Sequence, residues 1–218
     1  MQDTITLDMD STIIQYLCNK DKRLAKIIRM IGPISYEPHD EDPYAFFIHE
    51  IIEQMLSVKA ARRIYGRLEN LCDGKVSIES ISALSDEEIK STGTSVAKVE
   101  YIRNVTEAVA TGRWSFKEME VMSDKDVISL LTSVRGIGNW TAKMCLMFIF
   151  DRPNIIPYED GAFLQTYRWL YKTDDCSSES VKKRCSKWSP YATVASRYFY
   201  RALDLGLTKK EFHLFKEE

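Results

Sequence analysis

The stretch LLTSVRGIGNWTAKM, residues 130–144, places Gly136 and Gly138 on either side of Ile137 within a helical pattern. Glycine is favoured where the backbone must take a positive φ or where another molecule approaches it closely. A helix, a tight Gly-Ile-Gly turn and a second helix starting near Asn139 would form a hairpin with uncovered backbone amides. The stretch therefore predicts either an anion-binding hairpin, suited to a phosphate, or a tight connection between two packed helices.

Apolar residues elsewhere also recur with the 3.6-residue period of a helix, which predicts an all-α fold. The segment MCLMFIF, residues 144–150, is apolar all round, as is typical of a fully buried helix. The segment YATVASRYFYRALDLG predicts a helix that ends at Gly206. The segment AFFIHEIIEQML predicts an amphipathic helix with one apolar stripe, formed by Phe47, Ile48, Ile51, Ile52 and Met55.

Four capping boxes predict helix starts, because the Ser or Thr accepts from an orphan backbone N–H while the acid reaches back. The pairs are Ser85 with Glu88, Ser115 with Glu118, Ser123 with Asp126, and Thr208 with Glu211. The only alternating segment, TITLDM (residues 4–9), is too short for a sheet of its own. The fold class expected from these patterns is therefore all-α.

Composition is that of an ordinary globular protein, with 218 residues, 44% hydrophobic and 28% charged. No apolar run approaches the roughly 20 residues that cross a bilayer, and the acidic N-terminus lacks a signal-peptide core. We therefore expect no membrane partner and an intracellular location: cytoplasm or nucleoid in a prokaryote, nucleus in a eukaryote. Five scattered cysteines without a CxxC pair signal neither zinc nor an iron–sulfur cluster.

Charge gives a mixed indication about nucleic acid. The net charge of −2 argues mildly against a nucleic-acid partner, since a basic footprint is the usual sign. The run KAARRIYGR, residues 59–67, is locally basic, and EPHDEDP, residues 37–43, is acidic. A solvated helix face is the more common meaning of such runs.

Two proline-flanked breaks, at residues 32–43 and 151–161, divide the chain. They predict an N-terminal segment (1–42), a central helical domain that carries the hairpin (43–152) and a C-terminal helical segment (153–218).

The order of motifs resembles the helix-hairpin-helix (HhH-GPD) DNA glycosylases, in particular their alkylpurine, or DNA-3-methyladenine glycosylase II, branch. VRGIGNWTAKM followed by PNIIPYED is similar to the hairpin, the loop and the aspartate of that superfamily. DPYAFFIHEIIEQMLSVKAARRI, with its Gln-x-x-Ser, looks like the opening helices of the branch, and IKSTGTSVAKVEYIRNVTEAV looks like its middle segment. KWSPYATVASRYFYRAL is similar to its final helix, so the likeness runs from about Asp42 to Leu203.

The resemblance implies a two-domain helical fold with the active site in the interdomain cleft, the N- and C-terminal segments together forming the second domain. It implies a monomeric base-excision-repair enzyme that flips and hydrolytically excises alkylated purines, such as 3-methyladenine and 7-methylguanine, from damaged double-stranded DNA. The alternatives are a hairpin glycosylase for an oxidised or deaminated base, and a non-catalytic hairpin protein that binds DNA.

By the same resemblance, Asp160 is the catalytic carboxylate that stabilises positive charge on the sugar. Its position before GAFLQTYRWLY is also that of a helix N-cap, and both roles can hold at once. The adjacent Glu159 is a weaker rival. Trp140 occupies the position of the lysine found in bifunctional relatives, so we expect a monofunctional enzyme, with Lys143 a phosphate contact or a surface charge.

Three further features follow from the resemblance. Met55 aligns with the residue that intercalates into DNA, although the apolar stripe would instead make it a core residue. Trp140, Trp188 and Met144 would line the base pocket, with packing as the alternative for both tryptophans. This sequence departs from the family pattern at Ala192 and Gly161, and both departures concern this pocket.

The resemblance also implies that the chemistry requires no cofactor. The family hairpin holds a structural ion through backbone carbonyls, here those of Thr132, Val134 and Ile137, and hard oxygen ligands suit Na⁺, K⁺, Mg²⁺ or Ca²⁺. The amides that would face DNA are those of Gly136, Gly138, Trp140 and Thr141.

Overall fold

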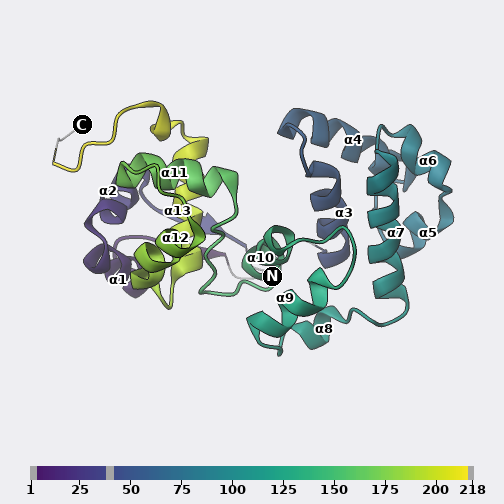
Figure 1. Ribbon diagram of the computed structural model, residues 1–218, viewed down its shortest axis with the longest axis horizontal. Helices are drawn as coiled ribbons and strands as arrows, with labels where there is room; N and C mark the ends of the chain where they lie inside the picture. The colour runs from purple at the N-terminus through teal and green to yellow at the C-terminus, as the bar shows by residue number, and fades with distance from the viewer. Residues whose placement is uncertain (1–3, 38–41, 216–218) are drawn as a thin grey trace. The chain divides into compact units, whose positions relative to one another are not determined.

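The computed structural model describes residues 4–37 and 42–215, and most of these residues are helical (Figure 1). The predicted all-α class is confirmed. Contacts between residues divide the chain into two compact units. We call them the terminal unit, residues 1–38 with 151–218, and the central unit, residues 39–150.

The terminal unit is built from both ends of the chain. Its α-helices are α1 (Thr12–Lys20), α2 (Lys22–Ile31), α11 (Gly161–Tyr171), α12 (Ser178–Cys185) and α13 (Ala192–Asp204). Two short 3-10 helices, η1 (Ser186–Trp188) and η2 (Leu207–Lys209), complete its helical part.

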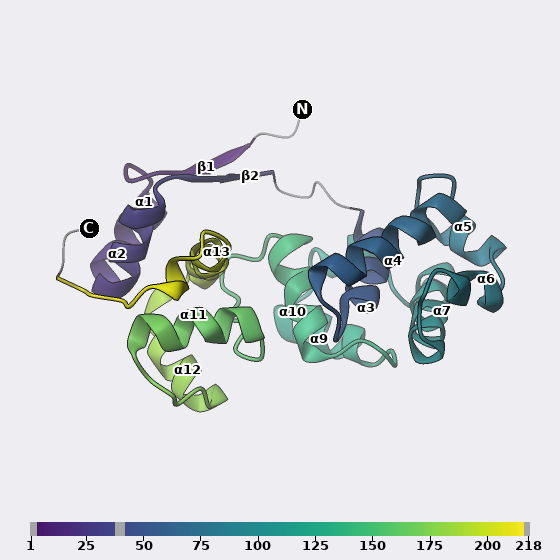
Figure 2. The same ribbon diagram turned by 90° about the horizontal axis from the view of Figure 1, so that it is seen from above.

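The alternating segment near the N-terminus forms one strand of a two-stranded antiparallel ribbon in the terminal unit (Figure 2). Strand β1 (Ile5–Leu7) pairs with β2 (Ile34–Tyr36), with Ile5 opposite Tyr36. The alternation indicated β1, but the prediction lacked its partner, which lies in the first proline-flanked break. The ribbon covers the core with Leu7, which is buried.

Aromatic rings form the core of the terminal unit, where α11 and α13 pack together. Phe163 and Phe199 stack with their centroids 4.9 Å apart, and Trp188 meets the Phe199 ring edge-on at 5.1 Å. Trp188 has no exposed surface. The residues between α12 and α13 therefore contribute directly to the hydrophobic core.

A buried carboxylate, Asp21, joins the N-terminal helices to the C-terminal half of this unit. Its Oδ1 caps α2 by accepting from the backbone N–H groups of Arg23 and Leu24. Its Oδ2 accepts from Trp188 Nε1 at 3.0 Å, from the hydroxyl of Tyr171 and from Lys187 Nζ at 3.0 Å. One side chain thus ties α2 to α11 and η1.

The described part of the central unit contains eight α-helices, α3 to α10. They are α3 (Pro43–Glu53), α4 (Val58–Leu71), α5 (Ile78–Ala83), α6 (Asp86–Ser91), α7 (Val96–Ala110), α8 (Phe116–Met119), α9 (Asp124–Thr132) and α10 (Asn139–Phe148). Helix α3 packs on α4, α7 and α10. The prediction of a fully buried helix is confirmed by α10, in which residues 141–147 are all buried.

Three of the four predicted helix starts are confirmed. Ser85, Ser115 and Ser123 precede α6, α8 and α9, and each accepts from the backbone N–H three residues on. The fourth, at Thr208, is wrong, because η2 ends at Lys209 and the chain continues in extended form. The predicted C-cap Gly206 follows α13 with a left-handed φ of 68°.

Among the described residues, no helix is long and apolar enough to span a membrane.

The Asp21 network generates a stability prediction. Burial raises the pKa of Asp21, but hydrogen bonds from Tyr171, Lys187 and Trp188 outweigh it and hold the pKa below the ordinary 3.8. A lowered carboxyl pKa stabilises the fold above about pH 3.8, and this stabilisation is lost as the pH falls through the lower folded value. We expect Asp21→Asn to reduce the free energy of unfolding at pH 7 by about 1–3 kcal/mol.

Urea denaturation at pH 7 and at pH 3 measures this effect, and the difference from wild type should shrink at the lower pH. Asp174→Asn, at an exposed position of the same unit, is the control and should change stability by less than about 0.5 kcal/mol. An equal loss for Asp21→Asn at both pH values would contradict the linkage.

Candidate nucleic-acid interface

The predicted hairpin is present between α9 and α10, and its first glycine is required by the protein itself. Gly136 has a φ of +106°, which side-chain-bearing residues rarely adopt. A Cβ at this position would lie 2.4 Å from Cγ of Tyr101, a residue of α7. The turn thus passes directly against the Tyr101 ring, with room only for glycine.

The second glycine has no such internal reason. Gly138 is the N-cap of α10 with φ −96°, and a Cβ there would meet nothing within 4 Å. Glycine also has no side chain with which to cap the first amides of the helix. Glycine is favoured at helix N-caps, and the open space around Gly138 also allows a close approach from outside the protein.

Side chains from other helices fix the hairpin turn through its carbonyl groups. Asn104 Nδ2 on α7 donates to the carbonyl of Arg135 at 3.2 Å. Gln54 Nε2, just after α3, donates to the carbonyl of Gly136 at 3.0 Å. Within the turn, Ile137 N–H donates to Val134 O at 3.1 Å. Hydrogen bonds from α7 and from the end of α3 therefore hold the turn.

The predicted ion ligands belong to this same turn. The carbonyls of Thr132, Val134 and Ile137 are three neutral, hard oxygen donors within a span of six residues. Such a donor set fits an alkali or alkaline-earth cation and does not fit a soft transition metal. The ion site stays a prediction.

Met55, the residue predicted to insert into DNA as a wedge, lies outside the apolar stripe to which the periodicity assigned it. Helix α3 ends at Glu53, and the next turn gives Met55 a φ of +59° and complete exposure at 101%. The core alternative for Met55 is therefore wrong, whereas Phe47 and Ile51 are fully buried as expected. An exposed apolar side chain on a tight turn is suited to insertion between bases.

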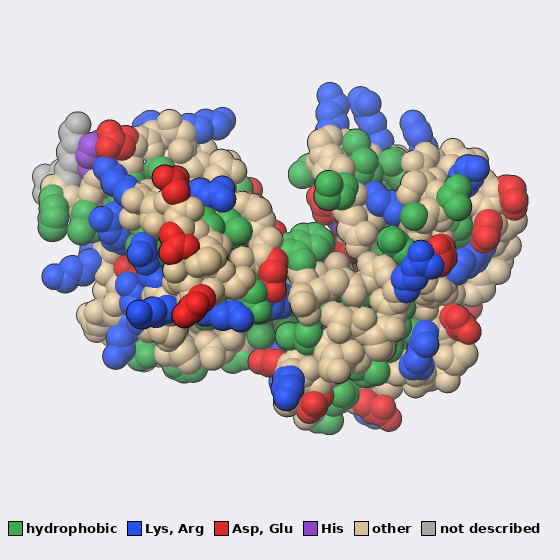
Figure 3. Space-filling model, in the orientation of Figure 1, with side chains coloured by type: hydrophobic (Ala, Val, Ile, Leu, Met, Phe, Trp, Pro, Cys, Tyr) green, Lys and Arg blue, Asp and Glu red, His purple; other side chains and the backbone are tan. Residues whose placement is uncertain are grey.

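The basic run predicted as a solvated face borders this turn. Lys59, Arg62 and Arg63 are exposed on α4, and Figure 3 shows Lys and Arg side chains projecting over that helix. Leu56 and Val58, at 39% and 63% exposure, continue the apolar surface next to Met55. Apolar and basic groups thus share one edge of the central unit.

In the terminal unit, Asp160 is the N-cap of α11, as its position in the sequence indicated. Its Oδ1 accepts from Phe163 N–H at 2.6 Å, and only 8% of the residue is exposed. The rival Glu159 is exposed. The N-cap bond fixes the direction of the Asp160 carboxylate.

Sequence reasoning missed Thr193, which anchors the loop leading to Asp160. Thr193 Oγ1 accepts from Ile155 N–H at 3.0 Å and donates to the carbonyl of Arg152 at 2.5 Å. Its own N–H donates to Pro153 O at 3.0 Å. The sequence around Thr193 does not indicate that this residue binds the loop at residues 152–155, which lies about forty positions earlier.

The three predicted pocket residues, Trp140, Met144 and Trp188, differ in exposure. Trp140 is half-buried and Met144 is largely buried on α10, and the pocket role of both stays a prediction. Trp188 donates its ring N–H to Asp21 inside the core, so packing explains the position of Trp188 without a pocket.

Lys143 is only 6% exposed, and its interpretation as a surface charge is wrong.

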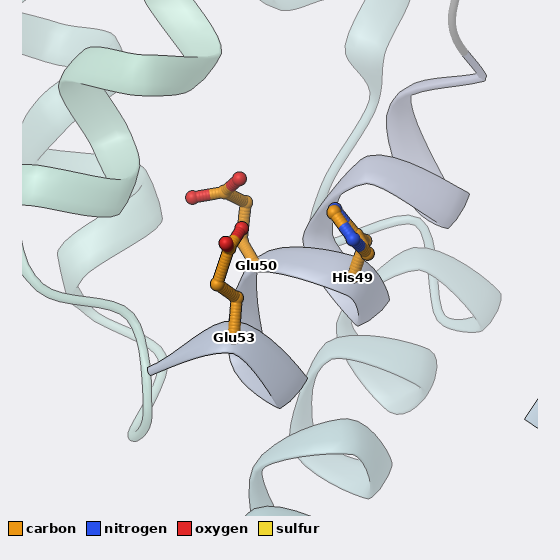
Figure 4. A group of neighbouring side chains, drawn as sticks. All are labelled: His49, Glu50 and Glu53. Atoms are coloured by element: carbon orange, nitrogen blue, oxygen red, sulfur yellow. The ribbon is translucent and has the colours of Figure 1, made fainter. Parts of the chain in front are cut away.

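Three side chains of metal-ligating type project from one five-residue stretch of α3 (Figure 4): His49, Glu50 and Glu53. One potential ligand atom from each lies within 4.8 Å of the others. The His49 ring also packs edge-on against Tyr65, with centroids 4.7 Å apart. Ring packing gives His49 a structural role, and acidic groups often cluster without an ion, so we assign no metal here.

The hairpin, its flanking helices and the aspartate loop all lie within the match to one protein family. The model of the HhH-GPD superfamily base excision DNA repair proteins matches residues 48–190. The chain belongs to this family. The predicted superfamily is therefore confirmed, and the match covers the hairpin as well as Asp160.

Individual relatives share most of the chain. DNA-3-methyladenine glycosylase 1 of Schizosaccharomyces pombe is 26% identical over 199 residues, covering 88% of this chain and 86% of the relative. A crystal structure of a DNA-3-methyladenine glycosidase from Bacillus halodurans has a TM-score of 0.84 and 33% identity, covering 96% and 97% of the two chains. The S. pombe 3-methyladenine DNA glycosylase in complex with abasic DNA, 23% identical, has the same fold (TM-score 0.81, covering 95% and 100%).

The two glycines of the hairpin generate separate predictions. We expect Gly138→Ala to fold normally, with a loss of unfolding free energy below about 1 kcal/mol, because its Cβ has room. Its affinity for duplex DNA should fall about tenfold, and equally for all sequences, because phosphate contacts carry no sequence information. Gly136→Ala should destabilise the protein by more than about 1 kcal/mol.

Fluorescence anisotropy with duplexes of unrelated sequence measures the affinity, and thermal melting reports stability. Gly66→Ala, inside α4, where a Cβ also meets nothing within 4 Å, is a matched control for the added methyl group. Unchanged DNA binding by Gly138→Ala would show that nothing approaches the hairpin there.

Proposed function

We propose that this protein is a monofunctional DNA glycosylase that removes alkylated purines, such as 3-methyladenine and 7-methylguanine, from double-stranded DNA. The observation that carries the proposal is the oriented carboxylate of Asp160 in a chain that belongs to the HhH-GPD family. Relatives that span nearly the whole chain are DNA-3-methyladenine glycosylases, which supports the substrate class.

Asp160 acts on charge that develops in the sugar. Breaking an N-glycosidic bond gives C1′ oxocarbenium character, which a nearby carboxylate stabilises. The N-cap hydrogen bond from Phe163 occupies Oδ1 and holds the carboxylate in one orientation. Preorganised charge of this kind lowers the barrier without reorganisation during the reaction.

The central unit supplies DNA binding and base extrusion. A base inside a duplex must be flipped out before its glycosidic bond can be reached. The amides of Gly136, Gly138, Trp140 and Thr141 bind a phosphate, while Met55 fills the space that the flipped base leaves. A cation held by the carbonyls of Thr132, Val134 and Ile137 would add positive charge beside that phosphate and supply no chemistry.

The leaving group accounts for the substrate class. A purine alkylated at N3 or N7 is positively charged in the nucleoside, so it departs without protonation by a general acid. Selection then falls to pocket surfaces that attract electron-poor rings, at roughly 0.5–2 kcal/mol for an aromatic face. Trp140 is the aromatic side chain proposed for this role, with Met144 beside it on α10.

Asp160→Asn should abolish base release while DNA affinity changes less than about twofold, because the carboxylate acts on the transition state and not on phosphates. The measurement is release of methylated purines from methylated duplex DNA in single turnover. Anisotropy with the same duplex measures binding. Near-wild-type release by the variant would refute the assignment.

A panel of duplexes that each hold one modified base separates the rival functions in the same assay. Release of 8-oxoguanine or uracil without release of methylated purines would identify a glycosylase for another lesion. Binding without any release would identify a non-catalytic hairpin protein. Glu159→Gln is the matched control for Asp160→Asn and should retain activity, because Glu159 is exposed.

Borohydride should not trap the protein on lesion-bearing DNA, because Trp140 offers no amine for a Schiff base. Strand breaks should appear only after alkali is added. Denaturing electrophoresis after reduction detects a covalent adduct, with a bifunctional lyase on the same DNA as the positive control. An adduct lost in Lys143→Met would reveal that buried lysine as a nucleophile.

A further inference from the structure

The turn that carries Met55 is held by one lysine. Lys98, in the first turn of α7, donates from Nζ to the carbonyls of Ile52 at 2.8 Å and Gln54 at 2.7 Å. These carbonyls end α3, where no intrahelical partner remains for them. Lys98 is half-buried, and this burial lowers the pKa of its ammonium from the ordinary 10.5. The side chain gives up hydration to reach two backbone oxygens.

The two hydrogen bonds hold a conformation that the backbone does not favour. Met55 adopts a φ of +59°, which is uncommon for a residue with a side chain. Its side chain is fully exposed and contributes no packing that would offset this cost. The carbonyls bound by Lys98 lie on both sides of Glu53, immediately before Met55, so the ammonium fixes the direction in which the chain turns.

A small pocket of about 80 Å³ lies beside the turn. Lys98 lines it together with Ile52, Leu56, Ile64 and Thr94. Lys98 therefore reaches the carbonyls of Ile52 and Gln54 next to a space that other side chains leave open.

The same face of α7 also holds the hairpin. Lys98, Tyr101 and Asn104 follow one another at intervals of three residues, which places them along one side of the helix. Tyr101 packs against Gly136, and Asn104 donates to the carbonyl of Arg135. Since Gln54 itself donates to Gly136 O, the turn and the hairpin are also joined directly.

We propose that Lys98 is a positioning residue for base flipping: it locks the turn that presents Met55 to the hairpin-bound DNA. The inference rests on the proposed function. A wedge unstacks bases only if it resists being pushed back, so a mobile turn would bind DNA but insert Met55 less often. Lys98 acts through Met55 and touches neither the base nor the reacting bond.

The test compares Lys98→Met, which keeps the length of the side chain, with Lys98→Arg, which keeps the donors. Single-turnover release of a methylated purine should fall roughly tenfold or more in Lys98→Met, because two charge-assisted hydrogen bonds are lost. With the lesion opposite an abasic site, where no base pair resists extrusion, the loss should be below about threefold. Lys98→Arg should recover most of the duplex activity.

A double-mutant cycle with Met55→Ala shows whether Lys98 works through the wedge. In the Met55→Ala background, Lys98→Met should cost less than about twofold. Lys90→Met, which removes an exposed lysine of α6, controls for the lost positive charge and should match wild type. Additive losses, or an equal loss on both substrates, would overturn the positioning role.

Hydrogen exchange tests the inference without catalysis. Amides of residues 54–57 should lose protection in Lys98→Met, while those of α10 keep theirs. Unchanged protection would overturn the inference even if the enzyme is active. Lost protection in Lys98→Met, together with a wild-type protein that releases no methylated purine, would refute the proposed function and leave the structural role of Lys98 standing.

Discussion

The contact between the Tyr101 ring and the backbone of Gly136 is the constraint from which the central unit can be understood. The turn crosses the ring so closely that a Cβ would lie 2.4 Å from it, and this crossing lies between the end of α9 and the start of α10. Because Tyr101 stands on α7, the hairpin is built against the longest helix of the unit. Lys98 and Asn104, on the same helix, hydrogen-bond to the turn that carries Met55 and to the carbonyl of Arg135.

The terminal unit meets a different constraint, because its two parts are separated in the sequence by the whole central unit. Closing such a long loop costs entropy, which contacts between the two parts must offset. Asp21 gathers a helix cap, a tyrosine, a tryptophan and a lysine around one buried carboxylate. Trp188 is therefore bound to the core by its polar group as well as by its ring.

Sequence patterns predicted most helices, the hairpin and the N-cap role of Asp160, because each depends on local spacing and capping chemistry. They failed where a contact with a residue distant in the sequence determines the local structure. The stripe from Phe47 to Ile52 continues by periodicity to Met55, but α3 stops at Glu53 where Lys98 binds its last carbonyls. Thr193 and the burial of Lys143 could not be predicted either, since their surroundings come from distant parts of the chain.

The two glycines also reconcile a DNA partner with a net charge of −2. Gly136 is explained within the protein, by its φ and by Tyr101, whereas Gly138 has room for a side chain and a φ that any residue adopts. Binding by backbone amides at such a site uses fixed dipoles and needs few lysines or arginines. Fewer cationic contacts release fewer counterions, so affinity built on this hairpin depends less on salt than affinity built on a basic surface. The exposed Lys59, Arg62 and Arg63 lie instead on α4, beside the turn that carries Met55. In the proposed function their charge would strengthen the approach to DNA, while the hairpin would hold the DNA backbone.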